Sequence, residues 1–390
     1  MSKNPTLDFG PVRPDEIGPL NGLLEQALSF PVGHMAPWTE VIGHEHMRAV
    51  RRDGRAVAGM SVIPMGHYFG GRSVPAGGIT AVGVAPDQRG TGVGLWMLQQ
   101  SVLELARQGL PLATLYPATT AFYRRSVFER AAHRLTYEIP LASLGVRDYA
   151  LEAVPAGPEH YDTIKSLYQQ YAARGSAMID RPDFYWKQIL EPKDKPAHRF
   201  LALRDGVPEG YVVFLHATWG EMLQVRDIAA LSPGAGRRLL TLLADHRSML
   251  EKARIFGGPS DTVLFLMGEQ HHKLVNSIDL MVRILNVPGA LAARGYPAGL
   301  SAELHLEVSD DLVPANNGRF LLQVAGGEGR AEPGGEGLLR ASIRGLAALY
   351  SGYLSPRELQ ALELIDGPPE ALATAELLFG GQRPWLPDMF

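Results

Sequence analysis

The chain has 390 residues, which is long for a single hydrophobic core and suits two or three domains. Hydrophobic residues make up 46% and charged residues 20%, as in globular proteins generally, and a net charge of −4 argues against a nucleic-acid-binding surface. The sequence holds no cysteine, which excludes disulfides, thiolate metal ligands and a cysteine nucleophile.

The first 18 residues lack the apolar core of a signal peptide, and no apolar run elsewhere is long enough to span a membrane, so we expect a cytoplasmic protein. Residues 8–30 predict a strand followed by an amphipathic helix. Asp53 and Gly54 lie between two apolar stretches and predict a hairpin. The pattern then predicts a strand at 77–85, a glycine-rich loop, a helix at 93–108 closed by Gly109, a strand at 112–118, a short helix at 120–126 and a strand at 133–141.

This α/β pattern recurs more weakly further along the chain. Residues 200–217 again place Asp-Gly between apolar strands, and 223–253 again run from a strand into a long amphipathic helix. From about residue 280 the pattern becomes α+β, with a hairpin expected over 304–324 whose turn is Asn316-Asn317-Gly318. The sequence therefore predicts two related α/β domains followed by a third domain of another fold.

The segment at 87–94, DQRGTGVG, joins a predicted strand to a predicted helix. The N-terminus of a helix attracts phosphate, and glycine lets a phosphate approach the backbone. The glycines do not have the spacing of a dinucleotide-binding fingerprint, and no Gly-Lys-Ser/Thr follows, so a Walker loop is excluded. What remains is R-x-x-G-x-G, either as a phosphate-binding loop or as a glycine-rich corner without a ligand.

The segment resembles the pyrophosphate loop of GNAT (Gcn5-related) N-acetyltransferases, in which backbone amides bind the pyrophosphate of acetyl-CoA. The resemblance implies acetyl-CoA as cofactor, with the preceding strand beside its pantetheine arm. The cofactor-binding residues that it implies are Val82, Gly83, Val84, Arg89, Gly90, Thr91, Gly92, Val93, Gly94, Leu95, Ala118 and Thr119.

The segment FYRRSVFERA at 122–131 resembles the Eis (enhanced intracellular survival) acetyltransferases, and so does the layout of essentially the whole chain. The resemblance implies tandem GNAT-like domains of α/β type followed by an α+β domain resembling sterol carrier proteins. The expected boundaries are 1–150 for a GNAT domain that binds acetyl-CoA, 151–279 for a central GNAT domain without the loop, and 280–390 for the third domain with its tail. A homo-hexamer is implied as well.

By the same resemblance, Tyr123 is the acid that reprotonates the departing thiolate, a role that a phenol of pKa about 10 can fill at neutral pH. The alternative is a tyrosine that only packs. The tail RPWLPDMF is apolar and stiffened by proline, so we expect it to be docked rather than frayed. In Eis-type enzymes the terminal carboxylate is the base, which here is the carboxylate of Phe390. Docking for packing alone is the alternative.

The expected reaction is direct attack of a primary amine on the thioester, with the oxyanion held by amides near Val82 and Val84. Aminoglycosides, polyamines and lysine side chains are candidate substrates, and Trp38 and Asp388 are candidate pocket residues. Neither GHEHMR at 43–48 nor the adjoining His271 and His272 has metal-ligand spacing, so no metal is expected. The competing hypothesis is a non-catalytic protein that binds acyl-CoA or another apolar ligand.

Overall fold

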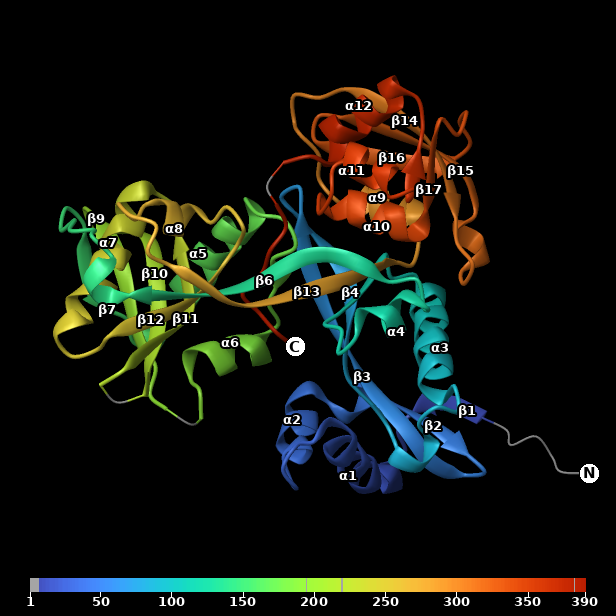
Figure 1. The fold of residues 1–390 in the computed structure, drawn as a ribbon, viewed down its shortest axis with the longest axis horizontal. Coiled ribbons are helices and arrows are strands. Elements are labelled where there is room, and N and C mark those ends of the chain that lie inside the picture. Colours follow the sequence, from blue (N-terminus) through green and yellow to red (C-terminus); the bar gives the residue numbers. More distant parts are fainter. Residues whose placement is uncertain (1–6, 194, 219, 382) are drawn as a thin grey trace, which may run out of the picture.

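A computed structural model of the chain describes residues 7–390 except 194, 219 and 382. Residues 1–6, which open the segment tested above for a signal peptide, lie outside the described part. Three lobes surround two long neighbouring strands, β6 (Glu129–Pro140) and β13 (Lys273–Ile284) (Figure 1). Within the described residues no helix combines the length and the apolar character needed to cross a membrane.

The N-terminal lobe follows the order that the sequence predicts, with one further helix, α2 (Met35–Ile42), that was not predicted. Its elements are β1 (Leu7–Pro11), α1 (Ile17–Leu28), α2 (Met35–Ile42), β2 (Met47–Arg52), β3 (Arg55–Phe69), β4 (Arg72–Val84), α3 (Val93–Arg107), β5 (Leu112–Leu115) and α4 (Thr120–Arg124). Asp53 and Gly54 both have positive φ, 51° and 83°, as the tight hairpin turn between β2 and β3 requires. The predicted hairpin, glycine loop and helix are thus confirmed.

The central lobe repeats this order, with one further short strand, β8 (Ile179–Asp180), between its first two helices. It consists of β7 (Glu152–Pro155), α5 (Tyr161–Ala173), β8 (Ile179–Asp180), α6 (Asp183–Leu190), β9 (His198–Arg204), β10 (Val207–Thr218), β11 (Met222–Ala230), α7 (Pro233–Ala244), β12 (Lys252–Gly257) and α8 (Thr262–Phe265). Asp205 and Gly206 form the second hairpin turn, with φ of 50° and 79°. The internal repeat seen in the sequence is therefore also a repeat of structure.

The two lobes share one 13-stranded sheet among the described residues. Its order is β1-β2-β3-β4-β5-β13-β6-β12-β11-β10-β9-β7, with β8 pairing to β3 outside this path. The N-terminal strands therefore reach β6 only through β13, which comes late in the chain, and the central strands reach β13 only through β6, which comes early. Each lobe completes its sheet with a strand from the other, and residue 279, where we expected the central domain to end, lies inside β13.

The third lobe has a five-stranded sheet in the order β16-β15-β14-β17-β18, packed with helices. Its elements are α9 (Val287–Ala293), β14 (Ala302–Ser309), β15 (Gly318–Ala325), β16 (Glu328–Pro333), β17 (Leu339–Ser342), α10 (Ile343–Ser351), α11 (Pro356–Ala361), β18 (Ile365–Asp366) and α12 (Pro369–Phe379).

The connection between β14 and β15 differs from the predicted tight turn. Gly318 already belongs to β15, where it pairs with Val308, and residues 310–317 form the loop. Buried Asp310 organises this loop, because it accepts hydrogen bonds from Arg283 of β13 and from the Asn316 side chain, at 2.7 and 2.8 Å. A buried ion pair with a distant strand, which local sequence does not reveal, replaces the short turn.

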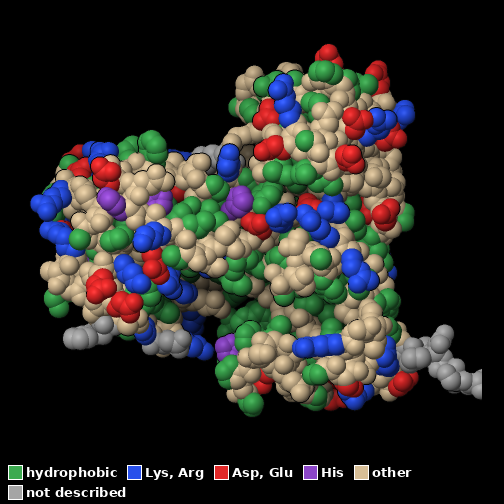
Figure 2. Space-filling model, in the orientation of Figure 1, with side chains coloured by type: hydrophobic (Ala, Val, Ile, Leu, Met, Phe, Trp, Pro, Cys, Tyr) green, Lys and Arg blue, Asp and Glu red, His purple; other side chains and the backbone are tan. Residues whose placement is uncertain are grey.

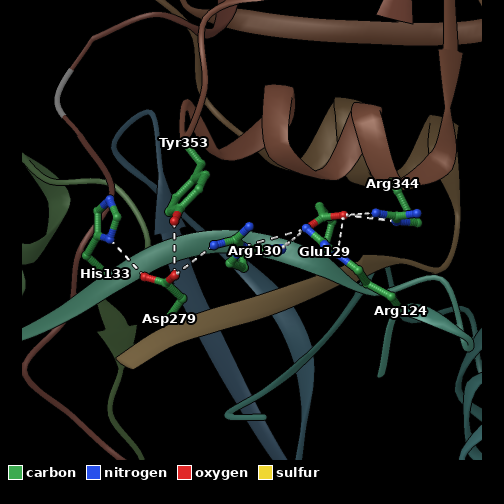
Figure 3. Close-up of polar contacts among 7 residues, drawn as sticks. All are labelled: Arg124, Glu129, Arg130, His133, Asp279, Arg344 and Tyr353. Carbon is green, nitrogen blue, oxygen red and sulfur yellow. Dashed lines mark hydrogen bonds and ion pairs between the residues drawn. The ribbon is translucent and has the colours of Figure 1, made fainter. Parts of the chain in front are cut away.

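Charged side chains tie the third lobe to the shared strands (Figure 3). Glu129 of β6 accepts a hydrogen bond from Arg344 of α10 at 2.9 Å. Asp279 of β13 accepts one from the Tyr353 hydroxyl at 3.1 Å and contacts the His133 ring nitrogen at 2.9 Å. The strands that join the two GNAT-like lobes therefore also carry the third lobe.

Candidate active site

The site begins where the parallel strands β4 and β5 separate. Their pairing runs only from Ala76 opposite Leu112 to Ile79 opposite Leu115, whereas β4 continues to Val84. Just beyond the last pair, β4 has a bulge: residues 81 and 82 lie opposite the single residue 60 of β3, and Ala81 has a φ of +51°. A bulge leaves one residue without a ladder partner and redirects its backbone groups, so this stretch of β4 is free to contact a ligand.

The glycine segment lies at the end of this opening. Gly90 and Gly92 have φ of 78° and 85°, a region that glycine enters without strain, and open space surrounds the position of a Cβ at both. No side chain caps the first turn of α3, so its backbone N–H groups are available to an anion. Arg89 donates a hydrogen bond to the Ala27 carbonyl at 2.9 Å, which joins the loop to the end of α1.

A cavity of about 290 Å³ adjoins the bulge. Figure 2 shows the surface hollowed between the part that carries α1 and α2 and the central lobe, with hydrophobic side chains gathered there. The residues that line the cavity are Leu28, Phe30, His34, Met35, Trp38, Ile79, Thr80, Ala81, Val82, Tyr116, Ala118, Tyr123, Met389 and Phe390. The structure thus brings the predicted residues Trp38, Val82, Ala118, Tyr123 and Phe390 to one cavity.

Tyr123 lies on α4, and its side chain packs against the rings of Phe122 and Phe128, with centroids 5.1 and 6.5 Å away. Burial raises the pKa of its phenol to about 12. The hydroxyl therefore keeps its proton throughout the neutral range, which suits a proton donor and does not suit a base. Thr119, the residue before α4, is exposed beside Ala118.

The C-terminal tail leaves the third lobe and runs between the other two lobes, where its end lies near α6 and α2 (Figure 1). The Tyr116 hydroxyl donates to the Asp388 carbonyl at 2.6 Å, and the Tyr185 hydroxyl donates to the Met389 carbonyl. The Phe390 ring lies 5.5 Å from that of Tyr116, centroid to centroid. The expected docking of the tail is therefore present.

The side chain of Asp388 points elsewhere. It is buried and accepts hydrogen bonds from Arg181 at 3.0 and 3.1 Å, and Asp388 is not among the residues that line the cavity. The sequence placed this carboxylate beside a cationic substrate, whereas the structure gives it a cation of the protein itself. Trp38, by contrast, lies in the cavity wall on α2.

Several residues of the site were missed from sequence. Tyr116 directly follows the last paired residue of β5, an edge where α/β proteins place ligands, so its position was a usable signal. His34 lies in the cavity wall, with its ring 4.7 Å from that of Phe30. Arg181 and Tyr185 belong to no motif, because they contact the tail from the central lobe and only the fold brings them there.

A phosphopantetheine carrier fits these residues. The strand opening would admit its extended arm, the bulge would offer backbone groups along that arm, and the uncapped helix start with its two glycines would hold a pyrophosphate. In the described part of the chain, no group of three or more His, Asp or Glu side chains is arranged to hold a metal ion.

Comparison with known proteins agrees with this geometry. Residues 9–131 and 177–284 match models of the acetyltransferase (GNAT) domain, and residues 287–387 match the sterol carrier protein domain. An uncharacterised N-acetyltransferase of Streptomyces griseus is 30% identical over 350 residues, covering 82% of this chain and 83% of the relative. N-acetyltransferase Eis of Mycobacterium tuberculosis is 27% identical over 332 residues, covering 76% and 80%.

Among solved structures, a GCN5-related N-acetyltransferase from Anabaena variabilis is 34% identical, with a TM-score of 0.94 over 99% of this chain and 100% of that one. The order of two GNAT domains and a sterol-carrier domain, predicted from the sequence, is confirmed. The chain belongs to the Eis-like N-acetyltransferases of the GNAT superfamily.

Proposed function

We propose that this enzyme transfers the acetyl group of acetyl-CoA to a primary amine within one ternary complex. The observation that carries the proposal is the convergence of three elements on one cavity: the bulge of β4, the buried phenol of Tyr123 and the docked residue Phe390. The absence of cysteine from the sequence favours direct transfer over a thioester-linked enzyme intermediate.

Each part of the site has a separate task in this proposal. Bound acetyl-CoA supplies the activated acetyl group. The N–H groups at the start of α3 and the glycine loop hold the pyrophosphate, and backbone N–H groups near Val82 and Val84 stabilise negative charge on the thioester oxygen. Tyr123 donates its proton to the departing sulfur. The carboxylate of Phe390 accepts the proton of the amine, directly or through a water molecule.

The cavity wall favours a particular class of amine. Among the described residues that line it none is Asp or Glu, while Phe30, Trp38 and Tyr116 present aromatic surface. Two acidic residues nearby are engaged with the protein: Asp388 with Arg181, and Glu25 with the backbone N–H of Met35 at 2.8 Å. We therefore propose a substrate with one ammonium group on an apolar or aromatic body. Such an ammonium can lie against aromatic faces, whereas a polycation would leave several charges unpaired.

The experiment is thiol release from acetyl-CoA, measured with a panel of amines, on protein with a free C-terminus. Since the enzyme has no cysteine, it contributes no thiol background. We expect arylalkyl and long alkyl monoamines to have kcat/KM values at least about tenfold above those of spermidine and an aminoglycoside. The reverse order would refute the proposed substrate class. No release with any amine, despite acetyl-CoA binding, would favour an acyl-CoA-binding protein.

The base is tested separately from the substrate. Because His34 also lines the cavity, it is the other candidate for accepting the amine proton. Amidation of the Phe390 carboxylate is expected to lower kcat by about 100-fold or more with little change in acetyl-CoA affinity, while His34→Gln retains most of the activity. An amidated enzyme of normal activity, together with an inactive His34→Gln variant, would transfer the role to His34.

The family resemblance also implies a cytoplasmic homo-hexamer, and we include both in the proposal. Sedimentation velocity of the purified protein distinguishes a hexamer from a monomer of 42.4 kDa directly.

A further inference from the structure

The central lobe contains a counterpart of the cofactor opening. Its parallel strands β11 and β12 pair only from Met222 opposite Lys252 to Gln224 opposite Arg254, while β11 continues to Ala230. Two residues after the last pair, β11 has a bulge at Arg226, because residues 213 and 214 of β10 pair with 227 and 225. In β4 the bulge follows its last pair at the same distance, so Asp227 occupies the position that Val82 holds in the N-terminal lobe.

This second opening has lost the means to hold a nucleotide. Residues 231 and 232 alone join β11 to α7, whereas residues 85–92 join β4 to α3. The start of α7 is also closed, since the Ser232 hydroxyl accepts the N–H of Ala235 at 3.1 Å. The strands still separate, but no phosphate site lies at the end of the gap.

The C-terminal tail fills the gap. A space of only about 10 Å³, close to that of a single water molecule, remains between Trp385 and Pro387 on one side and residues 225–228 and 255–256 on the other. The Trp385 indole lies so close to Gly258 that a Cβ there would approach its Cδ1 to 2.5 Å. Further out, a cavity of about 360 Å³ bordered by Tyr171, Ala230 and Trp385 lies beside the tail.

Backbone hydrogen bonds hold the tail along this path in the manner of an added strand. The N–H and carbonyl of His133 on β6 bond to the Pro384 carbonyl and the Leu386 N–H at 2.9 and 3.0 Å, and the Trp385 N–H bonds to the Ser176 carbonyl at 3.1 Å. Arg134 of β6 donates to the Pro387 carbonyl at 2.9 Å. Successive residues of the tail are thus fixed before the chain reaches the cavity.

Arg181 joins the bulge to the tail. Its guanidinium, which is fully buried, contacts Asp227 at 2.5 Å on one side and Asp388 at 3.0 Å on the other. The hydroxyl of Tyr211 also donates to Asp227, and the Arg181 guanidinium lies 3.6 Å from the centre of the Tyr168 ring. Three elements of the central lobe, α5, β10 and β11, together with Arg181 between β8 and α6, therefore hold the side chain of Asp388, two residues before Phe390.

We propose that the separated strands of the central lobe, whose counterparts receive the cofactor in the N-terminal lobe, are the intramolecular binding site of the C-terminal tail, and that Arg181 is the positioning residue that sets where Phe390 lies. The role of Phe390 rests on the proposed function; the docking of the tail does not. This inference gives the loop-less second GNAT-like domain a task, which is to bind the end of its own chain.

The test uses the full chain and two variants, one in the tail and one in the central lobe, each of which weakens a different contact between the two. Asp388→Asn keeps the shape of the tail but removes its charge toward Arg181. Gly258→Ala displaces Trp385 from the central lobe and lies outside the cavity wall. The matched control is Glu16→Gln, which neutralises a buried partner of Arg51 far from the tail, a pair 2.6 Å apart.

Two quantities are measured for each variant: hydrogen exchange of the Trp385 and Leu386 amides, and the steady-state kinetics. In both Asp388→Asn and Gly258→Ala we expect these amides to exchange at least about tenfold faster and kcat to fall by about 10- to 100-fold. Acetyl-CoA affinity should be unchanged in both, and Glu16→Gln should behave as wild type. Slow exchange and normal kcat in both variants would overturn the proposal, and so would a loss of kcat without faster exchange. If the wild-type enzyme acetylates no amine, the exchange measurement still decides the docking.

Discussion

At the scale of one residue, burial keeps Tyr123 protonated and so rules it out as a base. The apolar contacts that raise its pKa to about 12 also keep the proton that the departing sulfur needs. We predict that Tyr123→Phe lowers kcat by about 100-fold or more and leaves acetyl-CoA binding unchanged. Steady-state assays measure kcat and titration with acetyl-CoA measures binding. The control is Tyr149→Phe, which replaces an exposed tyrosine. A kcat within twofold of wild type would restrict Tyr123 to packing.

His67 makes the stability of the protein depend on pH. The imidazole is fully buried, with ring nitrogens 2.9 Å from the Ala177 carbonyl and 3.2 Å from the Thr114 hydroxyl, and burial lowers its pKa to about 4. An unfolded chain protonates its histidines near pH 6.5. Below that pH the unfolded state binds a proton that the folded state refuses, so stability is present above pH 6.5 and is lost as pH falls toward 4.

We therefore predict that the free energy of unfolding falls by about 3 kcal/mol from this group between pH 6.5 and 4. Urea denaturation across this range measures the loss. His67→Asn is expected to be less stable at pH 7.5 and to have a shallower dependence on pH. A variant with the same slope as wild type would assign the acid sensitivity to other groups.

The sequence predicted some residues of the site but not others, and the difference has a physical reason. The glycines of the loop and Tyr123 lie within a continuous strand–loop–helix–strand segment, so local pattern could indicate them. Arg181 lies 207 residues from the carboxylate that it binds, and Asp388 looked like a ligand for substrate until that contact was seen. A contact between residues so far apart in the chain forms only when the protein folds, so no local sequence motif indicates it.

At the scale of elements, the two ends of α3 allow the effect of a substitution on acetyl-CoA binding to be distinguished from its effect on stability. Gly92, the N-cap residue of α3, has a φ of +85°, where an aspartate is strained and its negative charge repels a phosphate. We predict that Gly92→Asp weakens acetyl-CoA binding by about tenfold or more and lowers the melting temperature no more than the same substitution at another glycine of similar φ. Gly109→Asp, at the other end of the helix and with a similar φ of 79°, is the matched control and should bind normally. Equal loss in both variants would count against the loop.

The same scale shows where element prediction works. Both Asp-Gly hairpins and α3 were predicted from short, continuous patterns, and the structure has them. The predicted position of the turn between β14 and β15 was wrong, because Asp310 is buried in an ion pair with Arg283 and a longer loop forms instead. No sequence pattern indicated which strands would be neighbours where β6 and β13 cross between lobes.

At the scale of the whole molecule, the exchange of β6 and β13 makes the two GNAT-like lobes mutually dependent. We predict that a fragment of residues 1–150 lacks cooperative unfolding, because β13 is missing from between β5 and β6 and leaves their edges unpaired. Adding a fragment of residues 151–390 should restore a single thermal transition, measured by calorimetry. A cooperative transition in the first fragment alone would show that its lobe is independent.

The position of β13 also bears on how the protein is made. The strands on either side of its place are complete by residue 140, but β13 itself ends at residue 284. At ordinary rates of synthesis, of about 5–20 residues per second, the gap stays open for roughly 7 to 30 seconds while residues 141–284 are made. During this interval a newly made chain thus exposes the unpaired edges of β5 and β6, which can pair with strands of other chains. Molecular chaperones that shield such edges, and the speed of translation through residues 141–284, are therefore expected to govern the yield of active enzyme.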